Sequence, residues 1–167
     1  MLLDDFSVLG LRTSQFVGAV TTTETVGTPA LGAVTTLNSF TVPAGVFGTN
    51  GDYIEFEYWG ITAEADGCEV FLFLGSDAGF DSAAFHPDNL GWHLTGKAIR
   101  SSSSQVTFYS TFQSVLSSGA AYNKTSTVTV SSLDLLIPNV LALNGAGTTI
   151  NDVRLQGSCL KFYQILS

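Results

Sequence analysis

Pairs of acidic residues are the first feature of this sequence that could carry chemistry. Glu55 and Glu57 flank a single residue, and Asp77 and Asp81 lie close together further along the chain. Hydrolysis by paired carboxylates requires two acids that face each other across a cleft. Glu55 and Glu57 fall instead on one face of an alternating stretch, where acids are usually solvated. We therefore predict that these acids are not a catalytic pair.

A histidine that activates a nucleophile would have to be His86 or His93, the two histidines of the chain. His86 belongs to a Phe-His-Pro-Asp segment whose composition favours an exposed loop. His93 follows Trp92 in a stretch that we expect to be a strand. No catalytic motif accompanies either histidine, so the sequence predicts a protein that is not an enzyme and that has no catalytic residues.

The residues from Gly75 to Gly91 form the longest irregular stretch and contain three aspartates, Asp77, Asp81 and Asp88. Carboxylate oxygens suit Ca²⁺, but this spacing does not match an EF-hand loop, and Asp is also a common turn residue. We expect no bound metal and no cofactor. Surface loops often carry function, however, so the sequence does not decide whether this loop binds a metal or a sugar.

Four aromatic residues could bind a sugar, because aromatic faces stack on sugar rings. They are Tyr53, Trp59, Trp92 and Tyr109. The alternative, which we favour, is that these rings fill the core of the protein or an interface.

Composition limits the partners of the chain. The net charge is −8 with six Lys and Arg residues, too few to neutralise many phosphates or to dock on anionic lipid. We therefore expect neither a nucleic acid nor a membrane as partner, and no apolar run approaches the roughly 18 residues that a membrane helix needs. Charged residues make up 12% of the chain, against about 25% in typical domains, as in chains with large buried interfaces.

The first residues point to a cytoplasmic origin, and a reducing cytoplasm in turn disfavours a disulfide between the two cysteines. Met1 to Asp5 lack the basic region of a signal peptide, so we expect the protein to be made in a cytoplasm or assembled there into something larger. Strand phasing places Cys68 with the core-facing Val70, and Cys159 on the opposite side from Leu160. The sequence predicts two unpaired thiols.

The elements that must hold these residues are β-strands. Residues 53–59 alternate between apolar side chains on one face and carboxylates and rings on the other, the period of a strand. We expect strands at 17–26, 34–42, 53–59, 68–74, 92–100, 105–113, 125–131, 139–144 and 153–165, the last with a break at Gly157. We expect loops or turns at 75–91, 101–104, 117–124 and 145–147, and either a strand or a turn at 133–138. Roughly eight or nine short strands predict an all-β, single-domain, jelly-roll-like antiparallel β-sandwich at residues 17–167, after an N-terminal arm at residues 1–16.

Two segments carry apolar side chains that must pack against another part of the protein or against a partner. The strand at 68–74 is apolar in both phases, with Phe71 and Phe73 opposite the core, so an arm, a loop or a partner must cover its second face. The arm at residues 1–16 packs either on its own domain or on a neighbouring subunit. The residues expected to contact a capsid or a sister subunit are Leu2, Leu3, Phe6, Leu9, Leu11, Phe16, Phe71 and Phe73.

Several short motifs occur in a familiar order. They are SFTVPA at 39–44, NGD at 50–52, WGITA at 59–63, WHL at 92–94, LALNG at 141–145 and NDV at 151–153. In this order the chain resembles a broad group of tailed-bacteriophage virion proteins over most of residues 36–165. This chain departs from the resemblance in the strand that follows the turn after WGITA. Many relatives carry a Lys there, whereas this chain has Glu69 and Val70.

The resemblance implies a β-sandwich that occurs as a capsid decoration (cement) protein, a head fibre or a part of a tail fibre, commonly as a trimer. The leading expectation is a decoration protein that binds the major capsid protein on the outer head as a homotrimer and stabilises the shell. Its location would be the virion surface, after assembly in the host cytoplasm. The alternative is a tail- or head-fibre component that binds host glycans.

Overall fold

The computed structural model describes residues 34–63, 67–85, 90–147 and 152–165, and the backbone of Leu11–Phe16 and Thr25–Val26. All regular structure in these residues is β. The strands are β1 (Leu11–Phe16), β2 (Thr25–Val26), β3 (Thr35–Val42), β4 (Tyr53–Thr62), β5 (Glu69–Leu74), β6 (Asp77–Asp81), β7 (Gly91–Ser102), β8 (Gln105–Val115), β9 (Ala121–Val130), β10 (Asn139–Ala146) and β11 (Val153–Ile165).

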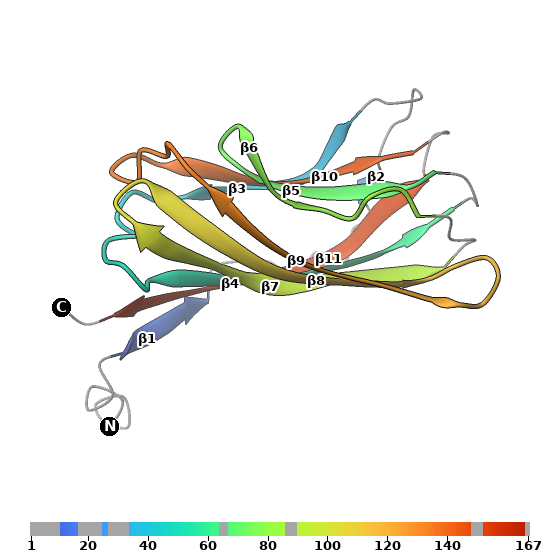
Figure 1. Cartoon of the computed structure of the whole chain (residues 1–167), viewed down its shortest axis with the longest axis horizontal. Helices are drawn as coiled ribbons and strands as arrows, with labels where there is room; N and C mark the ends of the chain where they lie inside the picture. Colours follow the sequence, from blue (N-terminus) through green and yellow to red (C-terminus); the bar gives the residue numbers. More distant parts are fainter. Residues whose placement is uncertain are drawn as a thin grey trace.

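The strands form two layers, which Figure 1 shows one above the other. The seven-stranded sheet has the order β1-β11-β4-β7-β8-β9, with β2 also paired to β11, and the four-stranded sheet has the order β3-β10-β5-β6. Neighbouring strands are antiparallel throughout the described residues. The predicted all-β, jelly-roll-like sandwich is confirmed.

β4 lies inside the seven-stranded sheet, between β11 and β7. Its alternation is the predicted one: Ile54, Phe56 and Tyr58 are buried, and the residues between them are half-buried on the outer face. Gly51 precedes the strand with a φ of 95°, a left-handed conformation that favours glycine. The strand continues to Thr62, past its predicted end at Trp59.

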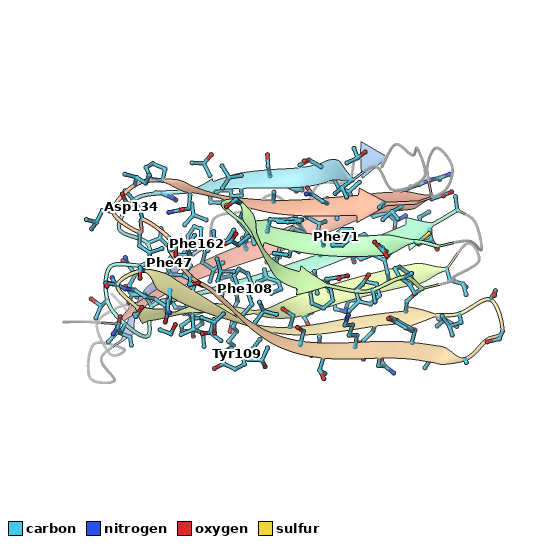
Figure 2. The ribbon with its side chains drawn as sticks, turned by 45° about the horizontal axis from the view of Figure 1, so that its top comes forward. Phe47, Phe71, Phe108, Tyr109, Asp134 and Phe162 are labelled. Carbon is cyan, nitrogen blue, oxygen red and sulfur yellow. The ribbon has the colours of Figure 1, made fainter. Side chains whose placement is uncertain are left out.

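The core between the sheets is rich in aromatic rings. Phe112 of β8 lies at the centre of one cluster, with its ring centroid 5.0 Å from Phe85, 6.0 Å from Phe80, 6.2 Å from Tyr122 and 6.3 Å from Trp92. Figure 2 shows Phe108 between the sheets and its neighbour Tyr109 on the other side of the ribbon. The exposed fractions of these two residues are 0% and 49%.

The predicted loop at 75–91 is wrong in its first half. Residues 77–81 form β6, which pairs with β5, and Phe85 forms an isolated bridge with Cys68. Phe80 and Phe85 are both buried in the core, and their contribution to the core outweighs the turn-like composition around them. The turn itself is at Gly75, with a φ of 64°. His86 and Asp88 lie outside the described residues.

Two other boundaries differ from the prediction. Residues 121–124, expected in a loop, begin β9, and Gly145 and Ala146, expected in a reversal, end β10. A Cβ at Gly145 would lie 2.9 Å from Leu37 Cδ1 and 3.1 Å from Val153 Cγ1, so glycine here allows close packing of β10 against its neighbours rather than a turn. Residues 133–138 form a turn, one of the two alternatives.

The N-terminal segments are described only in part. Of the strand expected at 17–26, Thr25 and Val26 are described, and both pair with β11. Of the expected arm, residues 11–16 form β1, whose backbone also pairs with β11. The other residues of both segments lie outside the described part of the chain.

Burial raises the pKa of the Tyr58 phenol above its ordinary value of 10.0. Because the unfolded chain loses this proton near pH 10 and the folded chain keeps it, stability should fall as pH rises above about 10. From this group alone, we expect the free energy of unfolding to be about 1.4 kcal/mol lower at pH 11 than at pH 9. Denaturant unfolding at both pH values measures this. If Tyr58→Phe were as sensitive to pH as the original chain, the assignment to Tyr58 would be wrong.

Candidate functional site

Three neighbouring strands, β11, β4 and β7, bring most of the polar candidates onto the outer face of the seven-stranded sheet. The register places Lys161, Glu55 and Lys97 in one row across these strands, and Cys159, Glu57 and Thr95 in the next. A third row holds Gly157, Trp59 and His93. Side chains paired in this way lie on the same face of a sheet and within reach of one another.

Glu55 is the centre of one polar cluster. Its carboxylate lies 3.1 Å from Lys97 Nζ and accepts a hydrogen bond of 3.1 Å from the Tyr163 hydroxyl. Tyr163 stacks on Tyr53 with centroids 4.5 Å apart, and Lys97 Nζ lies 4.9 Å from the centre of the Tyr53 ring. Partial burial, then the hydrogen bond with Glu55 and its negative charge, raise the pKa of Tyr163.

Glu57 makes a separate contact with His93. The distance between His93 Nε2 and Glu57 Oε1 is 2.8 Å, and both side chains are part-exposed. Glu55 and Glu57 therefore lie side by side on one face, as predicted, each beside a nitrogen-bearing side chain. They do not face each other across a cleft, which is the geometry that hydrolysis by two carboxylates requires.

This face carries two shallow depressions. The first, of about 310 Å³, is lined by Glu55, Phe56, Glu57, Thr95, Gly96, Lys97, Cys159 and Lys161. The second, of about 410 Å³, is lined by Trp59, Gly60, Gly91, Trp92, His93, Gln113, Ser114 and Val115. Trp59 and His93 stand between the two.

Trp59 lies on the sheet surface in a fixed place. A Cβ at Gly157, its partner on β11, would collide with three atoms of the indole, so the ring covers the backbone of Gly157. The pairing of β4 and β11 shifts by one residue just before Gly157, which is the predicted break in the last strand.

The four aromatic candidates do not share one environment. Trp92 is 2% exposed and its Nε1 donates a hydrogen bond of 3.3 Å to the Ile61 carbonyl, so its indole belongs to the core, as the favoured alternative predicted. Tyr53 and Trp59 are half-buried on the outer face, and Tyr109 is exposed. A sugar on this surface would therefore meet Trp59 or a tyrosine rather than the indole face of Trp92.

The aspartates proposed for a metal make ordinary turn contacts. Asp81 accepts a hydrogen bond of 2.6 Å from the Ala83 amide, and Asp77 accepts one of 3.3 Å from the Ser76 hydroxyl. Within the described residues, no group of three or more His, Cys, Asp or Glu side chains could hold a metal ion. Asp88, the third aspartate, is outside them.

The outer face of the four-stranded sheet carries an apolar strip on β5 and β10. Phe71 and Phe73 of β5 are half-buried there, with ring centroids 6.2 Å apart. Phe73 pairs with Ala142 on one side and with Ala78 on the other. Val140, two residues before Ala142, is 44% exposed. The outer side of β5 is apolar, as predicted, and it is only partly covered within the described part of the chain.

Charge is divided between the sheets. All six Lys and Arg residues of the chain fall in strands of the seven-stranded sheet: Arg12, Lys97, Arg100, Lys124, Arg154 and Lys161. The strands of the four-stranded sheet contain none, and their acids are Glu69, Asp77 and Asp81.

Other expected contact residues lie where no side chain is described. Leu2, Leu3, Phe6 and Leu9 are outside the described residues, and Leu11 and Phe16 are described as backbone at the two ends of β1. Neither cysteine is in a disulfide, as predicted: Cys68 is buried, with its thiol 3.7 Å from the Asp152 carbonyl oxygen, and Cys159 is half-buried.

The two packed antiparallel sheets define the chain as a jelly-roll-like β-sandwich. Comparisons with known proteins do not assign it to a family. No family model matches it, and no curated protein matches it. A solved structure of a Lotus tetragonolobus seed lectin isoform is similar over 95% of this chain and 94% of that chain, with 11% identity and a TM-score of 0.43. A likeness at this TM-score carries no argument about function. No helix in the described residues could span a membrane.

Proposed function

We propose that this chain is a non-enzymatic structural protein of a tailed-phage virion, a decoration protein that assembles as a homotrimer and binds the major capsid protein on the outer head. The observation that carries this proposal is the partly exposed apolar strip of Phe71, Phe73, Val140 and Ala142 on the outer face of the four-stranded sheet. In the trimer, the four-stranded sheets face the threefold axis and the seven-stranded sheets face outward.

The side chains on that face favour burial against protein. Phe71, Phe73, Val140 and Ala142 carry no charge, and the hydrophobic effect favours covering them. Because both phenylalanines are already half-buried, each would contribute only a part of the roughly 1.5–3 kcal/mol that full burial of an exposed ring gives. Three acids lie around these side chains: Glu69 at the start of β5, and Asp77 and Asp81 on β6, the edge strand. An uncharged centre with a polar rim is the usual anatomy of a protein interface.

Phe73→Lys should convert the trimer into a monomer, because three ammonium groups would be buried without partners around the axis. Thr127→Lys is the matched control, since Thr127 is exposed on the outer face of the seven-stranded sheet. Light scattering measures both masses. A monomeric original chain, or a Phe73→Lys protein that stays trimeric, would overturn this assembly.

Binding to the shell is tested separately with capsids that lack decoration. Saturable binding of the original chain supports the decoration role, and no binding excludes it. Deletion of residues 2–9 leaves every described strand in place and should weaken binding if the arm contacts the shell. Unchanged binding would remove these residues from the mechanism.

A further inference from the structure

We propose that the outer face of the seven-stranded sheet is a binding site for a neutral oligosaccharide, which lies across β11, β4 and β7 and contacts Trp59. This site would stay open in the trimer described above, but it does not depend on that trimer. Shape, charge and the position of the indole each support it.

The shape comes from three rows of side chains. Small side chains, Cys159 and Thr95, form the floor of the first depression on either side of Glu57. The row with Lys161 and Lys97 lies on one side, and the row with Trp59 on the other. Successive rows on one face of a strand are about 7 Å apart, so the two outer rows are roughly 14 Å apart. The result is a shallow groove, and the Trp59 row that bounds it also lines the second depression.

Contacts with the two bounding rows hold both glutamates away from the middle of the floor. Glu57 reaches His93 at 2.8 Å, which holds its carboxylate toward the Trp59 row. Glu55 is held by Lys97 at 3.1 Å and by Tyr163 at 3.1 Å, away from the floor row. Side chains held in this way present their remaining lone pairs and N–H groups in set directions, which lowers the cost of ordering them when a ligand binds.

The charges select a neutral ligand. Glu55 and Glu57 balance Lys97 and Lys161 in the lining of the first depression, so an ion of either sign would meet like charge. A hydroxyl group both donates and accepts, and it can therefore bond to a carboxylate and to an ammonium group in one site. A ligand with many hydroxyl groups and no net charge matches this lining best.

The position of Trp59 favours an extended ligand. One side of the indole covers Gly157, and the ring stands with His93 between the depressions of about 310 and 410 Å³. A ligand that fills both depressions must pass over this ridge, with one sugar ring near the indole. A chain of sugars can do this, whereas a single sugar would occupy one depression.

The test is a titration of the full chain with neutral hexasaccharides, namely cellohexaose, maltohexaose, xylohexaose and mannohexaose, followed by calorimetry. We expect saturable binding of at least one. Trp59→Ala and Glu57→Gln should each weaken that binding at least tenfold, while Thr127→Ala, on the same face but two strands away from β7, should leave it unchanged. Gly157→Ala should also weaken it, because the added methyl group moves the indole.

Three outcomes would overturn the proposal. They are no saturable binding of any hexasaccharide, binding that survives both Trp59→Ala and Glu57→Gln, and tighter binding of hexaglutamate or hexalysine than of every sugar. Thermal unfolding of each variant shows whether it is folded, and Glu57→Gln keeps the size of the side chain if Trp59→Ala is unstable. Phe73→Lys should bind the sugar normally, which separates failure of this site from failure of the trimer.

Discussion

Phe112→Ala should lower the free energy of unfolding by about 3–5 kcal/mol, the usual cost of removing a buried phenylalanine ring. Phe112 is fully buried, and its ring lies close to four other aromatic rings that come from three strands and from Phe85. Because these rings come from both sheets, the surrounding side chains cannot all move into the vacated space. Urea unfolding measures the loss.

The control is Tyr109→Ala in the same strand. Tyr109 is 49% exposed on the outer face of β8, so its truncation should cost much less than that of Phe112. An equal loss for the two variants would mean that strand propensity, rather than core packing, determines the effect at these positions.

Asp52→Ala should lower the free energy of unfolding by about 2–4 kcal/mol, because it leaves two backbone N–H groups without their acceptor. The Asp52 side chain accepts a hydrogen bond of 2.6 Å from the Thr49 amide and one of 2.7 Å from the Ile165 amide, and the residue is 1% exposed. These bonds join the turn before β4 to the last residue of β11. Hydrogen exchange at the Ile165 amide should become faster in the variant.

Asp134→Ala is the matched control for Asp52. Asp134 also accepts a backbone hydrogen bond, of 3.0 Å from the Leu136 amide, but it is exposed and water can replace it. We expect this variant to lose less than about 1 kcal/mol. If Asp134→Ala cost as much as Asp52→Ala, burial of the carboxylate would not be the cause of the larger effect.

The sandwich itself could be predicted from the sequence because most of its strands alternate cleanly. Residues 53–59 show this for β4, and Val106, Phe108 and Phe112 were rightly placed on one face of β8. Prediction failed where local composition and burial conflict. Glycine and aspartate around β6 suggested a loop, yet Phe80 is 1% exposed in the core.

The candidate site could be predicted only in part. The sequence singled out Glu55, Glu57 and Trp59, and it placed all three correctly on one face. It did not single out Lys97, Lys161 and Tyr163 as their neighbours, because these residues are about 40 or more than 100 positions away along the chain. The available signal was that these residues alternate with buried ones. This alternation shows which face of the strand a residue lies on, but it does not show which residues of other strands lie beside it.

The sequence by itself determined which side chains face the core in the strands that alternate clearly, because that depends on a period of two along a single strand. It also determined that charge is scarce and that β5 is apolar on both faces. Only the tertiary structure decided that all basic residues fall in one sheet, and that Trp59 covers Gly157 beside a groove. The reason is that pairing and register between distant strands depend on how two sheets fill a common core, which no single segment specifies.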